Sequence, residues 1–311
     1  HPTKKVERMD RTTAGFDQLT RFWLETAPAR GVVARLDESL GTALRQHAYP
    51  PAVASCLRQL AGAAVLLASN LKQKAHVVLQ AQGTGAVPLL CVEASDGLTF
   101  RAYANVREDA QLADDADLVS LVAPNGDGRF VLSIVPVDGQ PYQGIVGLHG
   151  GSVATLLEEY LTNSQQTQTR LWLRQDGEAI EAMMLERLPE KASDEANAAW
   201  DAVVAQAETM FAEPFMPFPY VQWLQFAFAG HDVKLHPAQP ATFACACSIE
   251  RVLNALKLVG EEELRPLVEE QGKIETRCEF CGKGYEVTAK QFDSLFSENP
   301  PTHLPGSRTI Q

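Results

Sequence analysis

Positive charge is scarce in this 311-residue sequence. Lysine and arginine together number 27 against 39 aspartates and glutamates, which gives a formal net charge of −12. Nucleic acids and anionic membranes attract proteins through clustered positive charge, so we expect neither as a main partner. The longest apolar run, at about 60–68, is shorter than the roughly 20 residues that a helix needs to cross a bilayer. No membrane-spanning segment is therefore predicted.

Several other signals are absent. Charged residues interrupt the N-terminal stretch before any apolar run, so no secretory signal is expected and a cytoplasmic location is predicted. Gly83-x-Gly85 is not a dinucleotide fingerprint, because Pro88 replaces the third glycine and a strand is expected to follow. The sequence also lacks a P-loop, a catalytic triad and an H-x-E deaminase motif. We therefore expect that the protein is not an enzyme.

Cysteine is sparse, yet four of the six cysteines form two short clusters near the C-terminus. One residue separates Cys245 from Cys247, and two residues separate Cys278 from Cys281. Two close-spaced pairs match the four soft ligands of tetrahedral zinc. The spacing therefore predicts a Zn²⁺ site made of these four residues.

The spacing leaves the purpose of this site open. A one-residue spacer permits only a strained, easily reduced Cys245–Cys247 disulfide once the metal is gone, and a purely structural site gains nothing from it. The site is therefore either redox-active or a static zinc module for protein interaction. A third reading is a thiol–disulfide oxidoreductase using Cys278-Glu-Phe-Cys281, although the βαβ context of such a site is missing.

The first 188 residues show the pattern of an α+β domain with a mixed sheet and helices. Asp37 is expected to cap one helix and Ser152 another, and Cys56 falls on the apolar stripe of a long helix that begins near Pro51. Cys56 and Cys91 are both expected to be buried and inert. The expected strands are 76–80, 87–93, 98–106, 129–137, 142–148, 167–173 and 180–188.

Residues 189–240 are predicted to form a helical, aromatic-rich linker. Ser193 or Asp194 caps an amphipathic helix, and three prolines interrupt the chain after it. We expect the aromatic side chains to pack on the N-terminal sheet at rest and to form a sticky surface when the segment opens. The candidates for client binding are Trp200, Phe211, Phe215, Phe218, Tyr220, Trp223, Phe226 and Phe228.

Residues 241–297 are predicted to form a small zinc domain, followed by a flexible tail at 298–311. Helices are expected at 251–259 and 261–270, and a strand and a helix within 285–296. A module of this size buries too little surface to be stable alone. A structural zinc site supplies about 10–16 kcal/mol, so metal removal should unfold the module.

Several motifs carry a family resemblance that covers most of the chain, except about 190–240. They are Phe243-x-Cys245-x-Cys247-Ser248, Gly272-x-Ile274-Glu275, Cys278-Glu279-Phe280-Cys281, Arg101-Ala-Tyr103, Gly126-x-Gly128, Pro141-Tyr142-Gln143-Gly144-Ile145-Val146 and Ser164-Gln165-Gln166. The chain resembles the redox-regulated bacterial holdase family called heat-shock protein 33, or 33 kDa chaperonin. At Ser164-Gln165-Gln166 it departs from the usual Ser-Glu-Gln, so no role of that acid is carried over.

The resemblance implies a chaperone that binds unfolding client proteins under oxidative and heat stress, without ATP. It implies that the reduced, zinc-bound form is inactive. It further implies a Cys278–Cys281 disulfide that forms before a Cys245–Cys247 disulfide, followed by zinc release, unfolding of the C-terminal domain and linker, and a homodimer as the active form.

Overall fold

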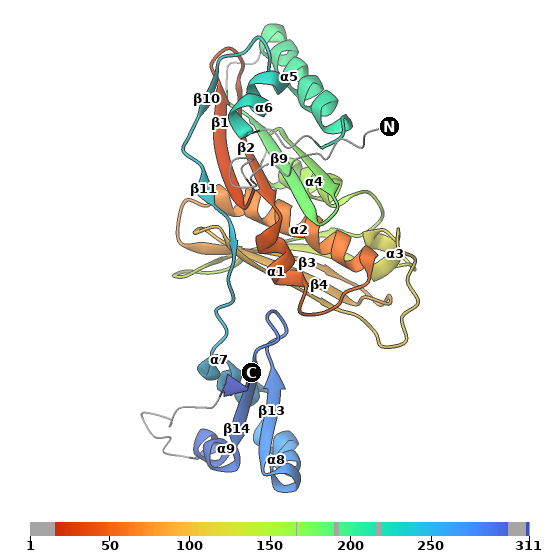
Figure 1. The fold of residues 1–311 in the computed structure, drawn as a ribbon, viewed down its shortest axis with the longest axis vertical. Coiled ribbons are helices and arrows are strands. Elements are labelled where there is room, and N and C mark those ends of the chain that lie inside the picture. Colours follow the sequence, from red (N-terminus) through yellow and green to blue (C-terminus); the bar gives the residue numbers. More distant parts are fainter. Residues whose placement is uncertain (1–15, 166, 190–192, 216–218, 298–308, 311) are drawn as a thin grey trace, which may run out of the picture. The chain divides into compact units, whose positions relative to one another are not determined.

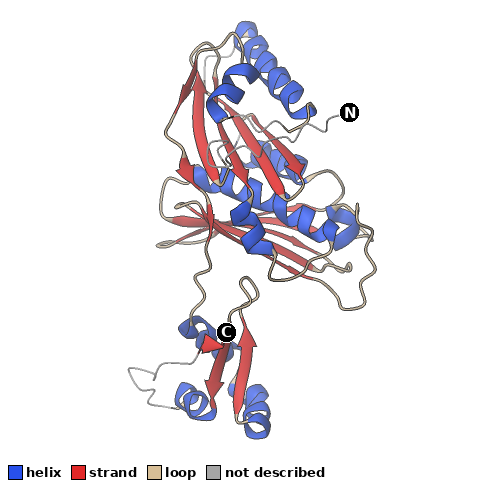
Figure 2. Ribbon diagram, in the orientation of Figure 1, coloured by secondary structure: helices blue, strands red, loops and turns tan. Residues whose placement is uncertain are grey.

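The computed structural model describes residues 16–165, 167–189, 193–215, 219–297 and 309–310. The chain divides into two compact units, His1–Ala244 and Cys245–Gln311, each with a hydrophobic core of its own. Strands and helices are mixed in both units (Figures 1 and 2). The α+β class predicted from the sequence is therefore confirmed.

The described part of the first unit contains two sheets. One, called sheet A here, is antiparallel and has the order β10-β1-β2-β9-β8, with β11 pairing to β1. Its two central strands are buried on both faces over most of their length and consist mainly of apolar residues. Its strands are β1 (Gln18–Leu24), β2 (Ala29–Leu36), β8 (Thr169–Asp176), β9 (Ala179–Arg187), β10 (Val233–Leu235) and β11 (Gln239–Pro240).

The other sheet, sheet B, has the order β12-β5-β4-β3-β6-β7. It is the predicted meander, with consecutive antiparallel strands and one short parallel strand, β12, at its edge. Its strands are β3 (Ala75–Gln82), β4 (Leu89–Ser95), β5 (Thr99–Asn105), β6 (Arg129–Pro136), β7 (Tyr142–Gly147) and β12 (Thr242–Phe243).

Helix α2 (Pro51–Ser69) packs against strands of both sheets and forms the centre of the core (Figure 1). Within the described ranges it is the one helix long and apolar enough to cross a bilayer, and 83% of that stretch is buried inside the protein. Arg58 and Gln59 interrupt the apolar residues of this helix, so its uninterrupted apolar run is 60–68, as expected from the sequence. Burial in a core accounts for this composition equally well.

The remaining helices of the core are short, and their caps only partly match the prediction. They are α1 (Glu38–Leu44), α3 (Leu118–Val122) and α4 (Val153–Gln165). Ser152 accepts a hydrogen bond from the Thr155 amide at the start of α4, as predicted. Asp37 occupies the N-cap of α1, but its side chain makes no capping hydrogen bond, because Asp17 Oδ1 accepts the amides of Asp37 and Ser39, both at 3.1 Å.

Two helices of the predicted linker cover the face of sheet A that points away from α2: α5 (Asp194–Ala212) and α6 (Tyr220–Ala227). Ser193 caps α5 by accepting a hydrogen bond from the Ala196 amide. Both helices and sheet A share one apolar cluster, which includes Phe22, Met183, Trp200, Val203, Met210, Trp223 and Phe228. The segment is thus packed against the sheet in this structure.

Within its described residues, 245–297 and 309–310, the second unit has three helices and three strands. They are α7 (Ile249–Val259), α8 (Glu261–Gln271), β13 (Lys273–Arg277), β14 (Gly284–Thr288), α9 (Ala289–Phe296) and β15 (Thr309–Ile310). β15, from the predicted tail, pairs antiparallel with β14. The core is small and centres on Leu253, Val287 and Phe292.

Candidate metal centre

Cys245 and Cys247 lie in the loop that leads into α7. Ser248 ends this loop as the N-cap of α7, and its hydroxyl accepts a hydrogen bond from the Arg251 amide at 3.4 Å. The cap fixes where the helix starts, so the two cysteines stay in extended chain directly before it. Both side chains are half-buried.

Cys278 and Cys281 lie in the turn that joins β13 to β14. The Cys278 amide donates to the Lys283 carbonyl at 2.9 Å, and the Gly282 amide donates to the Cys278 carbonyl at 2.8 Å. Gly282 has a φ of 68°, a left-handed conformation that glycine adopts without strain. The turn therefore holds both sulfurs on its inner side.

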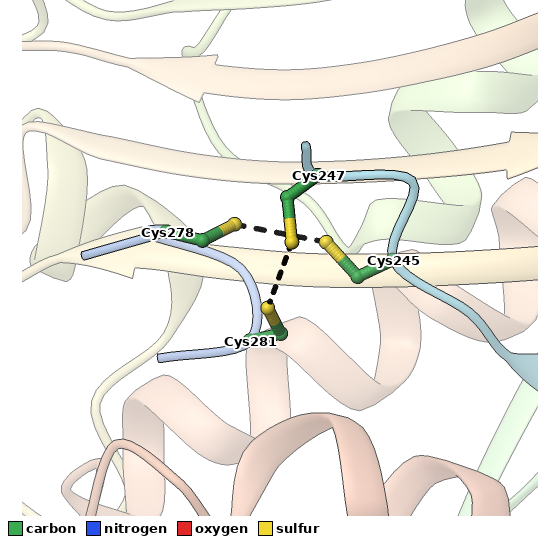
Figure 3. Close-up of side chains that lie close together, drawn as sticks. All are labelled: Cys245, Cys247, Cys278 and Cys281. Carbon is green, nitrogen blue, oxygen red and sulfur yellow. Dashed lines mark hydrogen bonds between the residues drawn. The ribbon is translucent and has the colours of Figure 1, made fainter. Parts of the chain in front are cut away.

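The two loops bring the four sulfur atoms together, as the spacing predicted (Figure 3). All four Sγ atoms lie within 4.8 Å of one another. Cys245 Sγ lies 3.6 Å from Cys278 Sγ, and Cys247 Sγ lies 3.4 Å from Cys281 Sγ. Zn–S bonds of about 2.3 Å in a tetrahedron require sulfurs about 3.8 Å apart. The cluster therefore fits a metal ion with four thiolate ligands.

The thiols differ in acidity. Burial raises the pKa of Cys247, but hydrogen bonding from Tyr285 and from the other three cysteines lowers it from 9.0 to about 7 overall. Burial raises the pKa of Cys278 and of Cys281. A cluster of this kind holds one thiolate near neutral pH, and that thiolate is the form that binds metals and reacts with oxidants.

The proposed client-binding residues lie apart from the cysteines in the sequence and have mixed exposure. Trp200, Trp223 and Phe228 are buried, whereas the Phe226 ring is 70% exposed. Phe211 and Phe215 are half-buried. Phe218 lies outside the described residues, as does the side chain of Tyr220.

A buried ion network beneath these aromatic residues was missed from the sequence. Arg35 Nε lies 2.7 Å from Glu181 Oε1, and both side chains are fully buried; Glu181 also pairs with Arg174. The Arg174 guanidinium donates to the carbonyls of Met210 and Glu213, at 2.8 and 2.5 Å. These hydrogen bonds satisfy carbonyl groups at the C-terminal end of α5 that have no partner within the helix. The available signal was a charged residue at positions 35, 174 and 181, but each of the three strands holds other charged residues as well.

Arginine faces also contact the aromatic rings in this region. The Arg174 guanidinium lies 5.0 Å from the centre of the Phe211 ring, and the Arg35 guanidinium lies 5.7 Å from that of Trp223. These separations are typical of cation–π contacts. The network therefore joins sheet A to both helices of the linker.

Comparison with known proteins gives consistent matches over most of the chain. The family model described as Hsp33 protein matches residues 17–288. The 33 kDa chaperonin of Methylobacillus flagellatus is 36% identical over 283 residues, which cover 90% of this chain and 94% of that protein. The 33 kDa chaperonin of Neisseria gonorrhoeae is 37% identical over 285 residues, 91% of this chain and 92% of that protein.

A solved structure agrees at the level of the fold. The crystal structure of the 33 kDa chaperonin from Thermotoga maritima superposes with a TM-score of 0.73 at 18% sequence identity and covers 90% of this chain and 97% of that one. The family model and the relatives both extend across the two sheets and the cysteine cluster. The chain therefore belongs to the Hsp33 family of chaperones.

Proposed function

We propose that this protein is a redox-regulated holdase whose four-cysteine cluster is the switch. The reduced, zinc-bound form is inactive, and oxidation of the cysteines unfolds the second unit and activates the protein. The observation that carries the proposal is the approach of all four Sγ atoms within 4.8 Å in a unit with a very small core. Cys245, Cys247, Cys278 and Cys281 are the proposed ligands.

Zinc suits this donor set better than harder divalent ions, because four sulfurs and no carboxylate or imidazole nitrogen form the cluster. When bound, the ion would keep the sulfurs as thiolates and tie the loop before α7 to the turn between β13 and β14. Because a unit of this size has few buried side chains, this metal link between the two loops supplies much of its stability.

The switch reaction forms disulfides within each loop. Two cysteine thiols lose two protons and two electrons, and one molecule of hydrogen peroxide takes them up to give two molecules of water. We propose that Cys278 and Cys281 react first and Cys245 and Cys247 second. Neither disulfide links one loop to the other, so the tie between the loops is lost and the unit unfolds.

The chain itself connects this unfolding to the first unit. The Ala244 amide, next to Cys245, donates to the Phe100 carbonyl at 3.0 Å, and the short strands β12, β11 and β10 precede it. Strands of two or three residues hold few hydrogen bonds and open readily once one end is free. We propose that opening spreads through them to α6 and α5 and exposes the aromatic residues.

The exposed surface would bind unfolded or partly unfolded client proteins, and the oxidised form would act as a homodimer in the cytoplasm. Trp200, Phe211, Phe215, Phe218, Tyr220, Trp223, Phe226 and Phe228 are the candidates for client contact. Nothing in this scheme requires catalytic turnover or ATP.

The test is suppression of aggregation of a heat-unfolded enzyme. Reduced, zinc-loaded protein is compared with protein warmed in peroxide, while a chromogenic chelator records released zinc. We expect zinc release and suppression to rise together, with little suppression by the reduced form. Equal suppression by both forms would show a static module, and reduction of insulin by the dithiol form would favour an oxidoreductase.

A further inference from the structure

A cleft opens between the two sheets of the first unit, where α2 ends at Ser69. One part has a volume of about 430 Å³ and lies against β1 and β2, and the other has a volume of about 660 Å³ and reaches β6 and α4. The two parts share five lining residues, so they form one continuous cleft: Arg30, Asn70, Lys72, Met184 and Glu186. None of these five residues belongs to the proposed switch or to the linker, although His236, which lines the smaller part, lies in the segment 189–240.

The larger part of the cleft is mostly apolar. Val77, Leu132 and Leu161 are buried side chains that close its inner end. Leu67 and Leu71, from the end of α2 and the loop after it, line it together with Ile134. Burying a hydrocarbon chain here would gain about 0.8 kcal/mol for each CH₂.

The smaller part of the cleft is cationic. Arg21, Arg30 and Lys72 line it against one carboxylate, that of Glu186. Arg30 Nε lies 2.7 Å from Glu186 Oε2, so this pair neutralises itself. Among the described residues, Arg21 and Lys72 form no ion pair, and Arg21 donates instead to Gln239 Oε1 at 2.8 Å and to the Ser69 carbonyl.

This local excess of positive charge contrasts with the whole chain, which carries a net charge of −12. Two cationic side chains in the cleft have no carboxylate partner in the part of the chain that the structure describes, and they lie beside an apolar recess. The site therefore has a cationic end and an apolar end. The Trp23 ring packs against the His236 ring in a tilted arrangement, with 5.0 Å between ring centres, and adds an aromatic wall at the charged end. Both volumes fall in the usual range of small-molecule sites, about 300–1,000 Å³.

We propose that this cleft binds a small single-chain amphiphile with an anionic head, such as a fatty carboxylate. The head lies between Arg21 and Lys72, where charge-assisted hydrogen bonds hold it. The tail extends past Met184 toward Leu132 and Leu161. Because the lining residues lie in the first unit, binding does not require oxidation of the cysteines or a working redox switch.

The test is calorimetric titration of the reduced full-length protein with octanoate, decanoate and 1-octanol. We expect saturable binding of one octanoate, about 15-fold tighter binding of decanoate because each CH₂ contributes about fourfold, and much weaker binding of octanol. Octanol binding as tight as that of octanoate, or no saturable binding of either carboxylate, would overturn the proposal.

Two surface variants locate the head group. Lys72→Ala should weaken octanoate binding about fivefold, the upper range for an exposed ion pair, and leave octanol binding unchanged. Lys74→Ala is the matched control, because Lys74 lies in the same loop, is exposed, and lines neither part of the cleft. Equal losses in the two variants would mean general attraction to surface charge and would contradict the proposed site.

One variant in the apolar part of the cleft locates the hydrocarbon tail. Leu71→Trp should fill the apolar part and abolish the preference for decanoate over octanoate. An unchanged thermal midpoint without ligand shows that the variant is folded. A folded variant that keeps the full preference would place the tail elsewhere and would overturn the proposal; if the variant does not fold, the Lys72→Ala comparison decides.

Discussion

Two pairs of sulfur atoms in the cluster approach each other across the two loops. Cys245 lies beside Cys278 and Cys247 beside Cys281, at 3.6 and 3.4 Å. A disulfide between the two loops would link them in place of the metal and keep the second unit folded. A disulfide within one loop leaves the two loops without any link. The pairing therefore decides whether oxidation opens the protein.

We expect oxidation of the zinc-loaded protein to give the Cys278–Cys281 and Cys245–Cys247 disulfides. A bound ion would separate the sulfurs until two are oxidised, and the turn around Gly282 already places its two cysteines on one side. Peptide mapping by mass spectrometry without reduction measures the pairing. A majority of Cys245–Cys278 and Cys247–Cys281 links would contradict the proposed opening.

The two remaining cysteines should not react in the folded protein. Burial raises the pKa of Cys56 to about 12 and that of Cys91 to about 11, so at pH 8 only about one Cys56 in ten thousand is a thiolate. Native alkylation with a chelator present, followed by mass spectrometry, should label four cysteines and spare these two. Labelling of Cys56 at the rate of Cys245 would show that α2 opens readily.

Residue spacing predicted that the four cysteines come together, because each short-spaced pair must lie close in any fold and tetrahedral zinc takes two such pairs. It did not predict that Tyr285 lies close enough to Cys247 to lower its pKa, because that approach depends on how the loop before α7 packs against β14, which is distant in sequence. The Arg35–Glu181 pair was missed for the same reason. Its members are 146 positions apart and meet through the register of β2 with β9.

At the scale of elements, local patterns predicted helices and strands better than their packing. The strands of sheet B follow one another in a meander, so the alternation of their residues was sufficient. The division into two sheets with α2 between them depends on contacts between distant strands. The cap of α1 was mispredicted because Asp17, which is distant from the helix in sequence, takes the role expected of Asp37.

Arg174 should hold α5 against sheet A. Arg174→Met removes the hydrogen bonds to the last turn of α5 and one side of a buried ion network, so local opening should become easier by about 3 kcal/mol. Hydrogen exchange of amides 209–212 in the reduced protein should then accelerate about a hundredfold.

The matched control for this experiment is Arg170→Met on the same strand. Arg170 also reaches α5, through Glu208 at 2.9 Å, but both side chains are exposed. Exposed pairs contribute about 0.5 kcal/mol, so exchange should change only two- to threefold. Similar acceleration in both variants would show that the buried network has no special part in holding α5.

At the scale of the whole molecule, the two units have separate cores of very different size. The first contains the large cluster around α2 and a second cluster under α5 and α6, whereas the second unit depends on a few side chains around Phe292 and on the cysteine loops. The two units should therefore lose their structure under different conditions.

Chelation should unfold the second unit and leave the core around α2 intact. Removing about 10–16 kcal/mol of metal binding exceeds what so small a core supplies, whereas the first unit contains no metal ligand from the cluster. Hydrogen exchange after zinc removal under reducing conditions should show lost protection at 249–296 and retained protection in α2. Protection that persists in α7 and α9 would show that the metal is not needed for folding.

Replacing Cys278 and Cys281 by serine tests whether the loss of the tie is sufficient for activation. The double variant lacks two of the four soft ligands, so it should bind zinc weakly and unfold its second unit without oxidant. Opening should then spread through β12, β11 and β10, and the variant should suppress aggregation in reducing buffer.

The control is Cys56→Ala, which changes a buried thiol outside the cluster and should remain inactive until peroxide is added. If the double variant loses the structure of its second unit but stays inactive, the chain between the units does not transmit the opening, and disulfide formation must act on the first unit by another route.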